Sequence, residues 1–159
     1  MTAEPAFSPQ RLAQLRFASL TEVRAALALL AREDLAAWLA TPDGEDMLRA
    51  VFAQMPARYI GGLTGPAQTA RWQVRREGAA TVVYDLILAE DVCEVREPGS
   101  AGEPALTLTL DAVGFVEMAS AAAQGMDLLL EGRLHISGDV QLAMRMELLF
   151  GLAAPGAPQ

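Results

Sequence analysis

The sequence predicts an α+β domain in which a five-stranded, mostly antiparallel sheet is covered on one face by helices. Apolar residues first recur at helical spacing over residues 1–57, and from about Gln68 they alternate with polar residues. After Asp111 a helical segment, a short strand and a last helix follow. Strands joined by short turns pair antiparallel, and helices bury their apolar stripes against one face of such a sheet.

The composition indicates one apolar-rich domain with an acidic surface. The chain has 159 residues, 52% of them hydrophobic, and a net charge of −8. This length supports one sizeable core, and no apolar run reaches the ~18 residues of a membrane span. The negative charge disfavours nucleic acid as a partner, because phosphate neutralisation supplies most of that affinity. For the same reason we expect membrane contact to be transient at most.

The first residues and the single cysteine bear on the compartment. The sequence MTAEPAFSPQ lacks the basic n-region and the apolar h-region of a signal peptide. We therefore expect a cytoplasmic location. Cys93 is the single cysteine, which excludes an internal disulfide.

Helical signals dominate the first third of the chain. Ser8-Pro9 is typical of an N-cap followed by proline at the first helical position. Ser19–Glu22 fits a capping box and predicts a helix that runs to about Ala40. A third helix is predicted to start at Thr41-Pro42 and to end at Met55-Pro56.

Period-two alternation predicts four strands in the middle of the chain. In the first strand, Ala70, Trp72 and Val74 share one face. The turn Glu77-Gly78 separates this strand from the next. The remaining strands are expected over Thr81–Leu88, Asp91–Arg96 and Leu106–Leu110.

Two aspartates frame the helices of the C-terminal part. Asp111 and Asp139 each stand where a helix N-cap belongs, and a carboxylate there accepts from the free N–H groups of the first turn. Between these two helices, Arg133–Ser137 alternates as a fifth strand. Because this strand arrives after a helix, it can add to the sheet in parallel.

The same part of the chain carries a family resemblance. Gly132–Asp139 reads Gly-Arg-Leu-His-Ile-Ser-Gly-Asp, and the last helix closes on Leu149-Phe150. With the strand and the acid-capped helix before it, the segment from Leu106 to Gly151 resembles the sterol carrier protein 2 (sterol-binding) domain family. Met55-Pro56, followed by the strand Arg71–Val74, is similar to the opening of bacterial members.

This resemblance implies a hydrophobic tunnel between the sheet and the helices, without catalytic residues, cofactor or metal. Family members bind sterols, fatty acids, acyl-CoA, phospholipids or isoprenoids. The chain would then consist of an N-terminal helical extension packed on the domain (1–54), a lipid-binding domain (55–151) and a disordered tail (152–159). The resemblance places these residues at the tunnel: Trp72, Tyr84, Phe115, Met118, Leu128, Leu129, Leu130, Glu131, Met146, Leu149 and Phe150.

We therefore predict a non-catalytic carrier of a lipid or other hydrophobic metabolite, of fatty acyl, sterol or isoprenoid type. Two alternatives stay open. The chain could serve as an accessory or scaffold protein for an enzyme of lipid, quinone or polyketide metabolism, with the N-terminal helices contacting that enzyme or a second copy. It could also be an enzyme that uses Glu131 as acid or base on an apolar substrate. His135 is the sole histidine, and a metal site needs several donors.

Overall fold

The computed structural model describes residues 31–62, 65–99, 102–119 and 123–150. Its elements in chain order are α3 (Arg32–Leu39), α4 (Pro42–Arg58), β1 (Gln68–Arg76), β2 (Ala79–Leu88), β3 (Cys93–Arg96), β4 (Leu106–Asp111), α5 (Ala112–Ala119), α6 (Gly125–Leu130), β5 (Leu134–Gly138) and α7 (Val140–Leu149). Within these ranges, each helix is too short or too polar to cross a bilayer.

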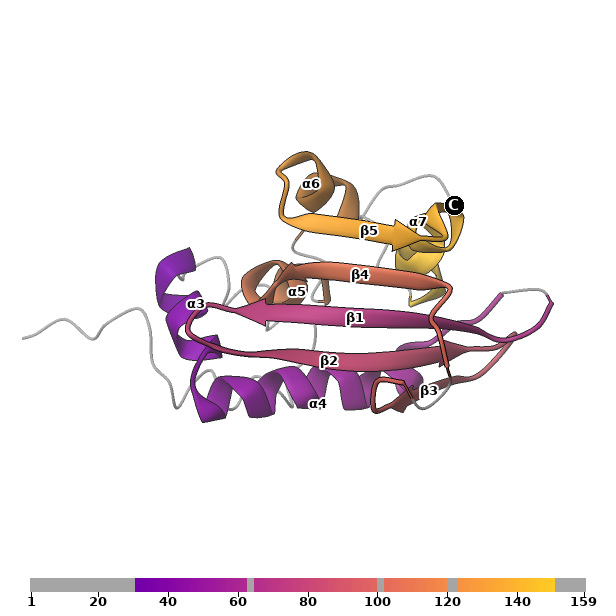
Figure 1. Cartoon of the computed structure of the whole chain (residues 1–159), viewed down its shortest axis with the longest axis horizontal. Helices are drawn as coiled ribbons and strands as arrows, with labels where there is room; N and C mark the ends of the chain where they lie inside the picture. Colours follow the sequence, from indigo (N-terminus) through magenta and orange to yellow (C-terminus); the bar gives the residue numbers. More distant parts are fainter. Residues whose placement is uncertain (1–30, 63–64, 100–101, 120–122, 151–159) are drawn as a thin grey trace, which may run out of the picture.

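The strands form one five-stranded sheet in the order β3-β2-β1-β4-β5. β2 pairs antiparallel with β1 and β3, whereas β4 runs parallel to β1. The parallel addition that the sequence allows for the fifth strand does not occur, because β5 pairs antiparallel with β4. The reason is α6, which follows α5 and returns the chain to the end of the sheet where β4 finished (Figure 1). A crossover with a single helix would have carried the chain to the opposite end.

The helices form a second layer against one face of the sheet (Figure 1). α4 lies along β2 and β3, α5 packs on β1 and β4, and α7 packs on β4 and β5. Two predicted helix limits are wrong. The sequence predicts one helix from Ser19 to about Ala40, of which Ser19 lies outside the described residues. The backbone of Ala31 is extended, with φ −71° and ψ 140°, so α3 begins only at Arg32. α4 continues past Met55-Pro56 to Arg58.

The core fills the space between the two layers. Ala70, Trp72 and Val74 of β1 face the helices, as their alternation predicts, together with apolar residues of β2 and β4. Leu48 and Phe52 of α4 enter the same core and are fully buried. Cys93 is also buried, and burial raises the pKa of its thiol to about 12. The thiol is therefore protonated at neutral pH.

The turn between α3 and α4 is a close backbone crossing. Thr41 caps α4, because its Oγ1 accepts from the Gly44 N–H at 3.2 Å. A Cβ on Gly44 would lie 2.2 Å from the carbonyl oxygen of Trp38 and 2.4 Å from Cα of Leu39. Arg76 of β1 fixes this corner to the sheet, donating to Glu45 at 2.8 Å and to the Leu39 carbonyl at 3.4 Å.

We expect Gly44→Ala to lower the free energy of unfolding by about 2 kcal/mol or more, because the clash is with backbone rather than with a side chain that could rotate away. Urea unfolding followed by circular dichroism measures this change. Ala53→Ser, at an exposed position of the same helix, should cost no more than about 0.5 kcal/mol. Equal stability of Gly44→Ala and wild type would contradict the close crossing.

Candidate functional site

A small apolar cavity lies between the sheet and the helices. Its volume is about 10 Å³, roughly the space that one water molecule requires. The walls come from β1, α4, α5 and α7 and from the residue that follows α7. The lining residues are Met55, Trp72, Phe115, Met118, Ala119, Met146 and Phe150.

Aromatic contacts hold the rigid part of this lining. Phe115 stacks on Phe52 with ring centroids 4.7 Å apart, and the edge of Trp72 meets Phe115 at 5.6 Å. Phe150 contacts Tyr59 at 5.2 Å. The other large lining side chains are methionines, which have three rotatable bonds and adapt to irregular spaces. The cavity therefore has fixed aromatic walls and adjustable thioether walls.

Five residues that the sequence places at a tunnel meet at this cavity, and the others lie elsewhere. Tyr84 is behind Phe52, whose ring it contacts at 4.8 Å, and it accepts a hydrogen bond from Arg49. Leu128 and Leu149 are buried in the core next to the lining set. The residues brought together are Trp72, Phe115, Met118, Met146 and Phe150.

The end of α6 points the remaining predicted residues away from the cavity. Leu129 lines a second apolar space, the α6–α7 groove. Leu130 is 79% exposed. The Glu131 carboxylate is exposed as well and pairs with Arg133 at 3.1 Å.

The α6–α7 groove has a volume of about 100 Å³ and lies over β4 and β5. Its floor consists of Leu108, Leu134 and Ile136, residues whose sequence alternation indicates one sheet face. Alternation alone does not tell which helix covers that face, so sequence reasoning missed this lining. The side chains that complete the groove come from α5, α6 and α7: Met118, Gly125, Met126, Leu129, Ala143 and Met144.

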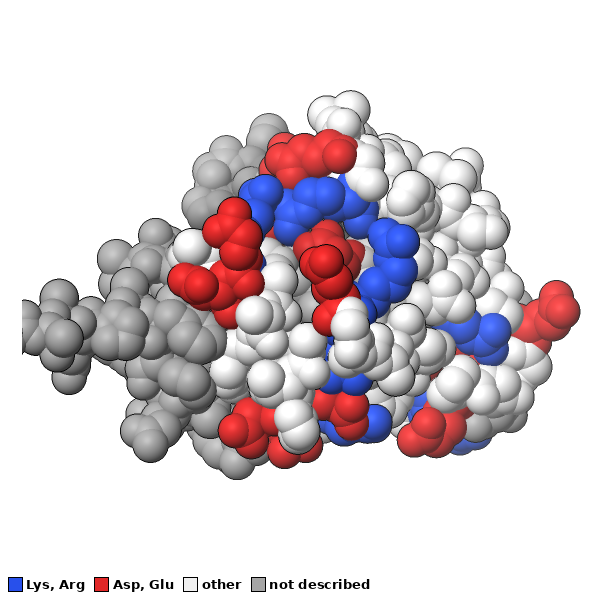
Figure 2. Space-filling model, turned by 60° about the vertical axis from the view of Figure 1, so that its left-hand side comes forward, with Lys and Arg blue, Asp and Glu red and all other residues white. Residues whose placement is uncertain are grey.

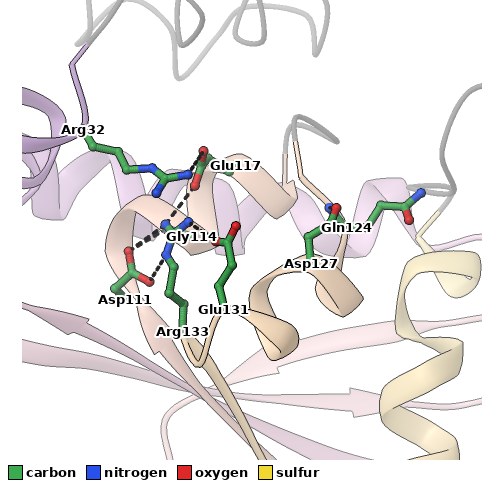
Figure 3. Close-up of polar contacts among 8 residues, drawn as sticks. All are labelled: Arg32, Asp111, Gly114, Glu117, Gln124, Asp127, Glu131 and Arg133. Atoms are coloured by element: carbon green, nitrogen blue, oxygen red, sulfur yellow. Dashed lines mark hydrogen bonds and ion pairs between the residues drawn. The ribbon is translucent and has the colours of Figure 1, made fainter.

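A network of charges around Arg133 holds α5 and α6 at the end of the sheet (Figure 3). The Arg133 guanidinium makes two hydrogen bonds to Asp111, with Nε–Oδ1 at 3.2 Å and Nη2–Oδ2 at 3.1 Å. It also donates to Glu117 at 2.9 Å and to Glu131. Arg32 of α3 approaches Glu117 from the other side, at 3.8 Å. The predicted cap is confirmed, because Asp111 Oδ2 accepts from the Gly114 N–H at 2.9 Å.

The network shifts the titration of both central partners. Burial alone would raise the pKa of Asp111, but the Arg133 hydrogen bond and the Gly114 N–H outweigh burial and hold this pKa below its ordinary value. Burial opposes the charged form of Arg133, yet its hydrogen bonds to Asp111, Glu117 and Glu131 raise the pKa of its guanidinium. Both groups are therefore ionised at neutral pH.

A polar hollow of about 410 Å³ lies next to this network and is distinct from the apolar cavity. It is lined in part by Arg32, Glu33 and Glu77. Figure 2 shows acidic and basic side chains interleaved on this side of the molecule. Arg133 and Asp111 pair with each other in its wall, so charges of both signs line the hollow. Among the described residues, no cluster of three or more potential metal ligands occurs.

Comparison with known proteins identifies related sequences and folds. Residues 61–151 match the model of a family described as the SCP-2 sterol transfer family. No curated protein matches the chain.

Solved structures are similar to this chain at low sequence identity. Sterol carrier protein 2 like 2 from Aedes aegypti is 15% identical, with a TM-score of 0.50 over 67% of this chain and 94% of that one. Sterol carrier protein 2 from Yarrowia lipolytica, in its apo form, is 16% identical, with a TM-score of 0.47 over 77% of this chain and 89% of that one. The MycE methyltransferase from the mycinamycin biosynthetic pathway is 11% identical, with a TM-score of 0.57 over 82% of this chain and 34% of that one. The predicted α+β fold is confirmed.

The Arg133 network predicts an acid-sensitive contribution to stability. Because the pKa of Asp111 is lower in the folded chain, this carboxylate stabilises the fold above the unfolded-state pKa, about 3.9, and the contribution is lost as the pH falls through the folded pKa. Asp111→Asn should therefore be less stable than wild type at pH 6, and the difference should shrink towards pH 3. Urea unfolding at a series of pH values measures it. Asp34→Asn, at an exposed position of α3, serves as the control for loss of a charge. If the stability difference between Asp111→Asn and wild type did not change with pH, the proposed role of the network would be refuted.

Proposed function

The chain belongs to the SCP-2 sterol transfer family, and from this premise we propose that it binds the aliphatic part of a lipid without catalysis. The proposed site is the space between sheet and helices where the apolar cavity lies. The observation that carries the proposal is the lining of that cavity, which consists of apolar side chains and the indole of Trp72. Such a lining selects a ligand by its apolar surface.

The energetics favour an alkyl chain or an isoprenoid. Burial contributes ~0.8 kcal/mol per CH₂ group, so a C16 chain gains on the order of 12 kcal/mol before the costs of ordering and immobilisation. The cavity of about 10 Å³ is far too small for such a chain as it stands. Binding therefore requires Met55, Met118 and Met146 to change rotamer and give up space, which their flexible side chains permit.

Trp72 adds one polar feature to this site. Its indole Nε1 is buried without a hydrogen-bond partner among the described residues. A buried unpaired N–H costs about 1–3 kcal/mol. A ligand hydroxyl, ester or carboxyl oxygen that reached Nε1 would recover that cost, so we propose an amphiphilic lipid rather than a pure hydrocarbon.

The position of Glu131 gives no support to catalysis on an apolar substrate. Its carboxylate is exposed and pairs with Arg133, outside the lining of the cavity. A carboxylate tuned for acid–base work at neutral pH needs an apolar setting. An accessory role for a pathway enzyme stays compatible with lipid binding, since the bound lipid could be presented to that enzyme.

The cavity can be tested by enlarging it. Met146→Ala should lower the free energy of unfolding by about 2–5 kcal/mol and should strengthen binding of palmitic acid about tenfold, because the ligand fills the space that Met146 leaves. Thermal unfolding with and without palmitic acid measures this change, since a ligand of the folded state raises the Tm. Native mass spectrometry counts the bound molecules.

Met47→Ala is the matched control. Met47 and Met146 are both 2% exposed, but Met47 lies in α4 outside the cavity lining. Its replacement should destabilise the chain similarly without strengthening palmitic acid binding. Equal gains in both variants would place the ligand elsewhere, and absence of bound lipid in wild type and in both variants would exclude the proposed function.

A further inference from the structure

We infer that Met118 is the gate through which a fatty acyl chain passes from the α6–α7 groove into the buried cavity. This inference rests on the proposed function and adds the entry route to it. The groove and the cavity are two separate spaces in this structure, and Met118 lines both of them.

Strand register places the two spaces side by side on the same face of the sheet. Trp72 of β1 pairs with Leu108 of β4, and Leu108 pairs with Ile136 of β5. Trp72 forms part of the cavity wall, whereas Leu108 and Ile136 form part of the groove floor. The row therefore continues from the cavity to the groove and ends at β5, which is an edge strand of the sheet.

α7 runs along both spaces and supports the same arrangement. Ala143 and Met144 line the groove, and Met146, three residues after Ala143, lines the cavity. The shared wall on the opposite side is Met118 of α5, which is 5% exposed. A methionine side chain can rotate about three bonds without breaking a hydrogen bond. Rotation of Met118 would join a groove of about 100 Å³ to the cavity.

The mouth of the groove is apolar, although its side chains face solvent. Met126, Leu129 and Met144 are 48%, 39% and 65% exposed. Clustered exposed apolar residues mark a site of interaction rather than chance exposure. We assign them to an alkyl chain and not to a protein segment, because the groove adjoins, across Met118, an internal apolar space that a folded partner cannot enter.

The test is the rate of uptake of cis-parinaric acid, a fluorescent polyene fatty acid, by the full chain in stopped flow. Leu129→Glu places a charge in the groove, whereas Leu130→Glu places the same charge on the next residue, outside the groove lining. Leu129→Glu should slow uptake about tenfold, and Leu130→Glu should match wild type. Met144→Glu and Val140→Glu form a second pair on α7, with Val140 as the exposed control.

Met118→Ala tests the gate directly. Removing the shared wall should raise the rate of association about tenfold, the change produced by a barrier about 1.4 kcal/mol lower, in addition to any affinity that the new space contributes. A Met118→Ala variant that associates at the wild-type rate and only dissociates more slowly would have gained affinity from new space alone, and that result would overturn the gate. Circular dichroism shows whether each variant is folded before its rates are compared.

The outcomes separate this inference from the proposed function. Uptake that is equal in Leu129→Glu and Leu130→Glu, with Met118→Ala at the wild-type rate, would overturn the entry route and leave lipid binding intact. No uptake by wild type or by any variant would overturn both. Slow uptake confined to the two groove variants, with fast association in Met118→Ala, is the result that the inference requires.

Discussion

The arrangement of the C-terminal half depends on the guanidinium of Arg133. Its hydrogen bonds reach Asp111 at the end of β4, Glu117 in α5 and Glu131 after α6, so one side chain joins three elements at the start of β5. Gly114 permits this junction, because a Cβ there would lie 2.9 Å from Asp111 Oδ1 and 3.4 Å from Leu128 Cδ2. Loss of a partner from such a network leaves partly buried charge uncompensated, which costs more than the pair itself contributes.

This junction also explains why polar and apolar sites lie apart. Glu117 of α5 and Glu131, which follows α6, both meet Arg133 (Figure 3), whereas Phe115 and Met118 of α5 line the cavity. A short helix can serve both roles, because residues three or four positions apart share one face and the other face is free for charge. The lining of the apolar cavity therefore contains no member of the charged network.

The sequence predicted the features that depend on neighbours along the chain. Alternation at Ala70, Trp72 and Val74 reported the buried face of β1, and the caps Asp111 and Asp139 formed as expected, the latter accepting from the Leu142 N–H at 3.1 Å. Strand direction was not predictable in this way, since it depended on the short helix α6 in a segment whose pattern indicated only an apolar run. The structure brings some of the residues that the sequence placed at the tunnel to the cavity, whereas Tyr84 lies outside its lining. Periodicity identifies an apolar face, but it cannot predict that the Phe52 ring packs between Tyr84 and the cavity-lining Phe115.

The small volume of the cavity agrees with a carrier role because flexible methionine side chains form part of its walls. An empty tunnel wide enough for an acyl chain would forfeit dispersion contacts along its whole length and destabilise the fold without ligand. In the proposed carrier, the methionines of the lining would keep those contacts in the free chain, and a bound ligand would replace them with contacts of its own. Affinity then depends on the difference between ligand and side-chain packing, plus the apolar surface that the ligand removes from water. Phe115 and Trp72 are fixed by their ring contact, so the exchange would fall to the methionines of the lining, Met55, Met118 and Met146.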